Sequence, residues 1–214
     1  FPTFPINFCG LGLPTMSAPL PQGFPAILDL TGRPCLLVGG GRIALRKAEQ
    51  LLASGAELTV IAPSIDPGFS SLAVDAIQRT YRSGDIDGFW LVVTATGNKE
   101  VDQEIFDEAE SKRVWCNSAD DPARCSFILP AVHRQGSIAI AVSTGGASPA
   151  LASWLRREIA ALVGPEYQEL AVRLAEERAA IKASGQSTED IDWRPIIDSL
   201  ISELGIIAPG SVQS

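Results

Sequence analysis

Short apolar runs alternate with segments of helical spacing through the first half of the chain. Helical spacing of apolar side chains covers residues 43–53 and 101–111. The strand-like runs are residues 35–38, 58–62, 90–96 and 114–116, with a weaker one at 77–81. Strands that alternate with helices of this length predict a Rossmann-like α/β fold, in which helices cover both faces of a parallel sheet.

The pattern changes after residue 125. Residues 126–132 and 137–142 predict two strands, and residues 133–136 form a connection short enough for an antiparallel hairpin. From Ser148 onward the spacing is helical, and Gly and Pro divide it into helices at 149–162, 165–183 and 190–204. We therefore expect three folded parts, which are residues 23–125, 126–163 and 164–214.

Residues 1–22 show neither a strand nor a helix period. They contain five prolines and lack the basic start of a secretory signal. The only methionine in the chain is Met16. We interpret residues 1–15 as an extension upstream of a start at Met16; the alternative is a disordered arm, and either way residues 1–22 are excluded from the fold.

Length and charge restrict the function classes. The 214 residues suit one large domain, or one domain with a small appendage, and 46% of them are apolar. The net charge of −8 argues against nucleic acid and anionic membrane surfaces as partners. No apolar run reaches the length of about 18 residues that a membrane-spanning helix needs.

The cysteines and the single histidine do not form a metal-binding pattern. Cys9, Cys35, Cys116 and Cys125 include no Cys-x-x-Cys pair, so we expect no metal site. Scattered cysteines favour reduced thiols and a cytoplasmic location. His133 falls in the expected hairpin turn, where a solvated side chain is favoured over an acid–base or metal-binding role.

A glycine-rich turn follows the first expected strand. Gly39-Gly40-Gly41-Arg42-Ile43-Ala44 fits the pattern G-x-G-x-x-[G/A], which lets the backbone approach a pyrophosphate at the start of a helix. The turn predicts a dinucleotide site; a purely structural turn is the alternative. The second strand ends in Ala62-Pro63-Ser64 without the acid that usually holds the ribose, and without a cation for a 2′-phosphate, which favours NAD over NADP.

Two further loops carry polar residues. Asn117 and Asp120 follow the strand at 114–116, where a carboxylate could act as a general base; an ordinary turn is the alternative. The loop with Thr144, Gly145, Gly146 and Ser148 precedes a helix, so its N–H groups could bind a carboxylate. A simple loop in which Ser148 caps the helix is the alternative.

Taken in order, these motifs resemble the precorrin-2 dehydrogenase family, which includes the amino-terminal module of siroheme synthase. The resemblance covers about residues 24–163. It is carried by residues 24–30, 38–44 and 46–48, by Asn117 with Asp120, and by residues 126–130 and 143–149.

The resemblance implies NAD-dependent oxidation of precorrin-2 to sirohydrochlorin, with Asp120 as the catalytic residue. Some members also insert ferrous iron, and the sequence does not separate the two types. It further implies a homodimer joined through residues 126–163, between an NAD-binding domain at 23–125 and a helical domain at 164–214. The implied cofactor contacts are Gly39, Gly40, Gly41, Arg42, Ile43, Pro63, Ser64, Thr94, Ala95 and Thr96.

The substrate carries many carboxylates, whereas the chain is acidic, so local cations must offset the charge. We expect Arg42, Arg124 and Arg134 to do so, and we place the substrate near Asn117, Arg124, Ser126, Arg134, Thr144, Gly145, Gly146 and Ser148. Two other functions remain open at this point. One is a non-enzymatic NAD-sensing regulatory module, and the other is an NAD enzyme for a small hydroxy acid, which would lack a catalytic histidine near the sheet.

Overall fold

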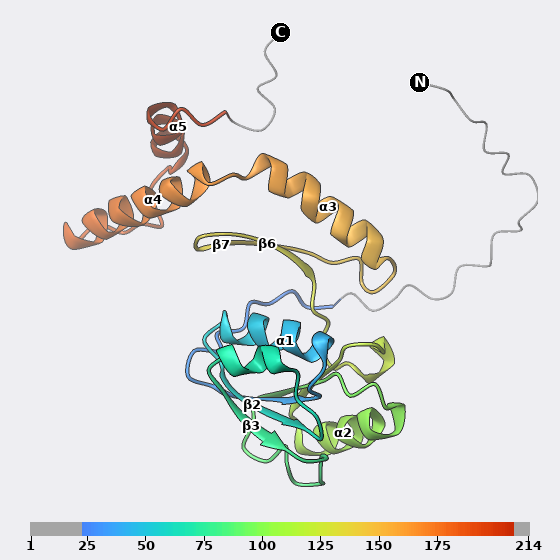
Figure 1. Ribbon diagram of the computed structural model, residues 1–214. Coiled ribbons are helices and arrows are strands. Elements are labelled where there is room, and N and C mark those ends of the chain that lie inside the picture. The colour runs from blue at the N-terminus through green and yellow to red at the C-terminus, as the bar shows by residue number, and fades with distance from the viewer. Residues whose placement is uncertain (1–22, 208–214) are drawn as a thin grey trace, which may run out of the picture.

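The computed structural model describes residues 23–207, so the expectations for residues 1–22 lie outside the described residues. Its main element is a five-stranded parallel sheet in the order β3-β2-β1-β4-β5 (Figure 1). The strands are β1 (Pro34–Val38), β2 (Glu57–Ala62), β3 (Val74–Gln78), β4 (Leu91–Thr94) and β5 (Trp115–Ser118). The predicted Rossmann-like sheet is confirmed.

Helices cover both faces of this sheet. Helix α1 (Arg42–Leu52) buries Ala44 and Ala48 on one face, where the short helix η1 (Pro67–Ser71) adds Phe69. Helix α2 (Lys99–Lys112) buries Ile105 and Ala109 on the other face. The central strand β1 is apolar throughout because alternate residues face two dry layers.

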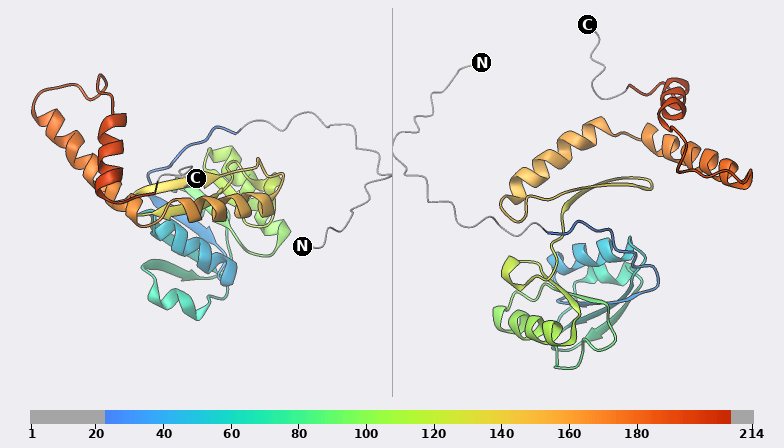
Figure 2. Two further views of the ribbon diagram at one scale, coloured as in Figure 1. Left: turned by 90° about the horizontal axis from the view of Figure 1, so that it is seen from above. Right: turned by 180° about the vertical axis from the view of Figure 1, so that it is seen from behind.

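A second unit follows the sheet. Strands β6 (Ala131–Gln135) and β7 (Ile138–Val142) form an antiparallel hairpin, and α3 (Pro149–Leu162) packs on it. Helices α4 (Glu166–Ala183) and α5 (Arg194–Glu203) meet around Leu170 and Leu200. The views in Figure 2 show these helices on the far side of the hairpin from the sheet.

The hairpin corrects two predictions. Its first strand begins at Ala131 rather than Ser126, and its turn is Gly136–Ser137 rather than residues 133–136. Residues 127–130 are apolar, as in a strand, but they do not pair as one. They leave the sheet and end in Pro130, which has no N–H to donate.

His133 is therefore not a turn residue. It lies within β6, and its Nε2 forms a 2.8 Å hydrogen bond with the carbonyl oxygen of Val163, just after α3. The interaction fastens the hairpin to the end of that helix. Among residues 23–207, no helix has the length and apolar character needed to cross a membrane.

Candidate functional site

The strand order reverses between β1 and β4, and the glycine-rich turn lies at this point. Gly39 adopts φ +129°, and a Cβ there would come within 2.3 Å of the carbonyl oxygen of Ala95 at the end of β4. Only glycine fits so close to another backbone at this angle. In open α/β sheets, ligands bind at the carboxyl ends of the strands where the order reverses.

Gly40 and Gly41 play opposite roles. A Cβ on Gly40 would lie 2.1 Å from the carbonyl oxygen of Ser64, so Gly40 lets the turn pack against the end of β2. A Cβ on Gly41 would meet nothing within 4 Å. The space beside Gly41 is open, as it must be if a pyrophosphate is to approach the backbone there.

The first turn of α1 offers free donors beside this space. The first helical hydrogen bond runs from Leu45 N–H to Gly41 C=O, and none of the side chains that the structure describes caps the helix. Among the described residues, the N–H groups of Arg42, Ile43 and Ala44 thus have no protein acceptor. Unpaired N–H groups at a helix start are a ready site for phosphate oxygens, so the residues present fit a dinucleotide.

The end of β2 supplies no carboxylate for the ribose. Ser64 is exposed, and Pro63 accepts a hydrogen bond from Gln78 through its carbonyl oxygen. Asp66, the next acid along the chain, accepts a 2.8 Å hydrogen bond from Gly68 N–H and so caps η1. Its own N–H donates to Gly40 C=O, which holds the two turns together.

The two threonines at the end of β4 have hydroxyl groups in different surroundings. The Thr94 side chain is fully buried, and its Oγ1 has no hydrogen-bond partner among residues 23–207. Thr96 Oγ1 donates a 2.7 Å hydrogen bond to the buried Asp102 of α2. The Thr94 hydroxyl is thus enclosed by the protein, whereas Thr96 and Ala95, which lies beside Gly39, are both partly exposed.

The end of β5 is tied to the segment that leaves the sheet. Asn117, which is buried, donates a 2.9 Å hydrogen bond from Nδ2 to the carbonyl oxygen of Phe127. Ser126 Oγ accepts from Cys116 N–H at 2.7 Å. Asn117 and Ser126 therefore shape the loop between them rather than facing open solvent.

That loop contains two neighbouring carboxylates, of which Asp121 is engaged by other residues and Asp120 is not. Asp121 forms an ion pair with Arg124 and accepts from Ala123 N–H at the start of the short helix η2 (Pro122–Arg124). Arg124 Nε also donates to Gln103 of α2 at 2.8 Å. Asp120 is exposed and makes no hydrogen bond or ion pair with other described residues, so it is available to a ligand.

Lys47, a cation that is not among the expected site residues, lies beside this loop. Burial lowers the pKa of Lys47 on α1, with the neighbouring charge of Arg46 acting in the same direction, while Cys125 and Asp120 act against it. Cys125 lies in the loop itself, and burial raises the pKa of its thiol. The motif Arg46-Lys47-Ala48 was visible in the sequence, but its spacing does not reveal which loop the lysine faces.

The remaining predicted substrate residues lie in the second unit. Thr144 and Ser148 close a loop in which Thr144 Oγ1 accepts from Ser148 N–H at 3.0 Å, and Ser148 caps α3 by accepting from Leu151 N–H. Gly145 and Gly146 have positive φ and open surroundings, and Arg134 is exposed on β6. No extensive packing joins this hairpin and α3 to the sheet.

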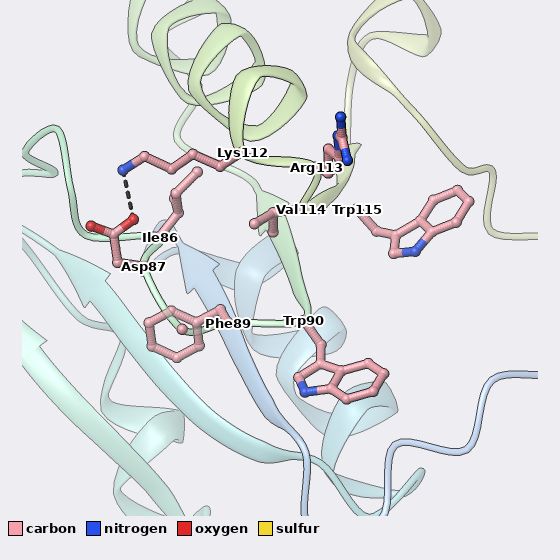
Figure 3. Close-up of a pocket in the computed structure, with 9 residues that line it drawn as sticks. Ile86, Asp87, Phe89, Trp90, Lys112, Arg113, Val114 and Trp115 are labelled. Atoms are coloured by element: carbon pink, nitrogen blue, oxygen red, sulfur yellow. Dashed lines mark hydrogen bonds and ion pairs between the residues drawn. The ribbon is translucent and has the colours of Figure 1, made fainter.

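A hollow of about 680 Å³ lies at the other end of the sheet. Figure 3 shows Trp90 and Trp115 projecting to the same side of it, away from the ion pair between Lys112 and Asp87. Both indoles stand where β4 and β5 begin, so this hollow is separate from the glycine turn. Within residues 23–207, no three His, Cys, Asp or Glu side chains gather to hold a metal ion.

Comparisons with known proteins agree with the fold. Residues 26–131 match the family described as putative NAD(P)-binding, so this part is a domain of the NAD(P)-binding type. Residues 135–162 match the family described as sirohaem biosynthesis protein central. The solved structure of SirC, a precorrin-2 dehydrogenase, has a TM-score of 0.69 at 22% identity and covers 86% of this chain and 99% of its own, so it shares the fold.

Sequence relatives are longer than this chain. The siroheme synthase of Methylobacillus flagellatus is 37% identical over 189 residues, which are 85% of this chain and 40% of that protein. The siroheme synthase of Citrobacter koseri is 38% identical over 162 residues, which are 74% of this chain and 35% of that protein. The chain thus spans less than half the length of these relatives.

Proposed function

The chain belongs to the family of siroheme synthases and precorrin-2 dehydrogenases, and on this premise we propose that it oxidises precorrin-2 to sirohydrochlorin with NAD⁺. The observation that carries the proposal is the open space at Gly41 beside unpaired helix N–H groups, at the point where the strand order reverses. The exposed carboxylate of Asp120 follows β5 at the same edge of the sheet.

The dinucleotide is held mainly by backbone in this proposal. The N–H groups of Arg42, Ile43 and Ala44 face the pyrophosphate, and Ser64 at the end of β2 lies nearest the ribose. When bound, NAD⁺ supplies the hydride acceptor. We assign NAD rather than NADP because residues 62–66 hold no cation for a 2′-phosphate.

Asp120 is the proposed general base. Oxidation of precorrin-2 removes one hydride and one proton, and a carboxylate within reach of the reacting carbon can take the proton. Asp120 is suited to this role because Asp121, its neighbour, is already engaged by Arg124 and by the cap of η2. Asn117 and Ser126 hold the loop in place through their hydrogen bonds to Phe127 and Cys116.

We also propose a homodimer joined through the hairpin and α3. Leu151, Trp154 and Leu162 on α3 and Val132 on β6 are each at least one third exposed, which leaves apolar surface for a second copy. A dimer would also explain how the loop with Thr144 and Ser148 approaches a sheet, because one chain alone does not pack that loop against its own. Light scattering of the wild type and Trp154→Glu tests this: the proposal requires a dimer that the substitution weakens.

The decisive experiment supplies enzymatically generated precorrin-2 with NAD⁺ or NADP⁺ and follows NADH at 340 nm together with sirohydrochlorin absorbance. Equal amounts of NADH and sirohydrochlorin, formed with NAD⁺ in preference to NADP⁺, are the expected result. A protein that binds NAD⁺ but forms no sirohydrochlorin would overturn the proposed reaction and favour an NAD-sensing module instead.

Iron insertion needs its own experiment, since the dehydrogenase reaction does not report on it. Sirohydrochlorin and ferrous iron are incubated with the protein without NAD⁺, and siroheme absorbance is followed against an enzyme-free control. A rate above the control assigns the chelatase reaction to this chain as well. A rate equal to the control limits the chain to the oxidation.

A further inference from the structure

Lys47 lies on the flank of α1 that faces the candidate base. Ala44 and Ala48 point into the sheet, and Leu45 on one flank reaches Gly68 of η1, on the β2–β3 side. Positions three and four apart share a helix face, so Lys47 extends from the opposite flank, toward β4 and β5. Phe127, which follows the loop after β5 that carries Asp120, packs into the same core layer as the two alanines.

The surroundings of Lys47 are only partly polar. Its side chain is half-buried, and it forms no hydrogen bond or ion pair with any other residue between 23 and 207. Burial, with the charge of Arg46 acting in the same direction, lowers the pKa of the Lys47 ammonium group, and the opposing influence of Asp120 and Cys125 does not outweigh it. A half-buried cation without a bonded acceptor costs folding free energy, which a bound anion could recover.

The other candidate cation of this loop is already occupied. Arg124 is bound by Asp121 and by Gln103, so its guanidinium holds the loop against α2. A substrate with many carboxylates must nevertheless be held close to Asp120 in an acidic protein. Neither Lys47 nor Arg42, both on α1, forms an ion pair with another described residue, and Lys47 is the one on which the charge of Asp120 acts.

Resting on the proposed function, we propose that Lys47 binds a side-chain carboxylate of the tetrapyrrole and so holds the macrocycle beside Asp120. Lys47 is then a substrate-binding residue that acts by charge and position, not a proton acceptor. Arg124 in turn positions the loop without touching the substrate.

The test compares Lys47→Met with Lys47→Arg and with Arg46→Met as the matched control. Arg46 precedes Lys47, carries the same charge and is exposed. Binding of sirohydrochlorin is measured by absorbance titration, binding of NAD⁺ by calorimetry, and turnover of precorrin-2 by NADH formation. The first two readouts need no chemistry, so binding and reaction are judged separately.

We expect Lys47→Met to weaken sirohydrochlorin binding about 10- to 100-fold, the range for loss of one charge-assisted hydrogen bond, and to raise KM for precorrin-2 far more than it lowers kcat. Lys47→Arg should recover most of the affinity, and Arg46→Met should stay within about twofold of wild type. Binding to the Lys47→Met variant should also depend less on salt, because one ion pair is gone.

Stability separates this role from a structural one. The Lys47→Met substitution replaces a half-buried charge with an apolar side chain of similar length, so Tm should stay equal or rise while substrate binding falls. A Tm that falls together with NAD⁺ binding would identify Lys47 as structural and overturn the proposal. So would a Lys47→Met variant that binds sirohydrochlorin as Arg46→Met does.

The two proposals fail in different ways. If wild-type protein neither binds sirohydrochlorin nor oxidises precorrin-2, the proposed function is wrong and the Lys47 assignment falls with it. If wild-type protein does both and Lys47→Met is indistinguishable from the control, only the Lys47 assignment is wrong.

Discussion

The backbone at Gly40 lies so close to Ser64 that an added Cβ would stand 2.1 Å from the Ser64 carbonyl oxygen. The neighbouring Gly41 has open space at the same position. The two adjacent positions thus require glycine for different reasons. Gly40 must be glycine so that the protein can pack, and Gly41 leaves space for a ligand to approach. Substitutions at these two positions should therefore affect different properties, stability at Gly40 and ligand affinity at Gly41.

The glycine pair gives the first prediction. Gly41→Glu should fold normally, since Gly41 has an extended backbone with φ −85°, but NAD⁺ affinity should fall about 100-fold or more as the carboxylate occupies the pyrophosphate site. Gly40→Ala should instead lower the free energy of unfolding by about 1–3 kcal/mol, because the added methyl group overlaps the Ser64 carbonyl. Urea unfolding and NAD⁺ calorimetry on both variants check this; equal loss of stability in the two would contradict the division of roles.

The second prediction concerns the two acids of the loop after β5. Asp120→Asn should keep NAD⁺ affinity and stability but lower kcat about 10²- to 10⁴-fold, the usual contribution of a general base. Asp121→Asn should retain most turnover and lose stability, because Asp121 pairs with Arg124. Steady-state kinetics with precorrin-2 decide the matter, and near wild-type turnover of Asp120→Asn would exclude Asp120 as the base.

The sheet and the glycine turn could be predicted because their signals are local. Buried parallel strands are continuous apolar runs, and the turn needs glycine at fixed positions. The direction of Thr94 could not be predicted, because a one-residue shift at the end of a strand turns a side chain from one face to the other. The hydrogen bond from Arg124 to Gln103 could not be predicted either. These residues lie 21 positions apart and meet only because η2 packs on α2.

The dependence on distant contacts also explains why His133 was predicted in a turn but lies in strand β6. Apolar residues 126–132 satisfy a strand pattern, and nothing local marks Phe127 as a residue whose carbonyl is taken by Asn117 instead of a strand partner. The hairpin therefore starts five residues later than predicted, at Ala131, and the histidine falls inside a strand. Tertiary hydrogen bonds, not propensity, set this boundary.

The third prediction uses the buried hydroxyl of Thr94. Because Thr94 Oγ1 has no hydrogen-bond partner in the described part of the chain, Thr94→Val removes an unsatisfied polar atom and should raise the free energy of unfolding by about 1–2 kcal/mol, with NAD⁺ affinity unchanged. Thr96→Val is the control, since it removes the donor to buried Asp102 and should be destabilising by about 1–3 kcal/mol. Weaker NAD⁺ binding by Thr94→Val would instead support a direct contact between the Thr94 side chain and the cofactor.

The last prediction is a pH dependence at the ion pair between Arg79 and Asp85. Hydrogen bonds from Arg79, at 2.6 and 2.8 Å, lower the pKa of Asp85 in the folded protein, with the backbone N–H of Arg82 acting in the same direction. A carboxyl with a lowered folded pKa stabilises the protein above its ordinary pKa of about 4, and this stabilisation is lost as the pH falls through the folded value.

Arg79→Met should therefore unfold at lower urea than wild type at pH 7, and the difference between the two should shrink as the pH is lowered from about 4 toward 2. Arg82→Met is the matched control, because Arg82 binds Asp85 through its backbone N–H, which the substitution keeps, and the charge that it removes is the smallest of the causes that lower the pKa of Asp85. Its unfolding midpoint should follow the wild-type curve. A gap between wild type and Arg79→Met that stays constant down to pH 2 would mean that Arg79 stabilises the protein by packing, since only an interaction with ionised Asp85 can disappear when that carboxylate is protonated.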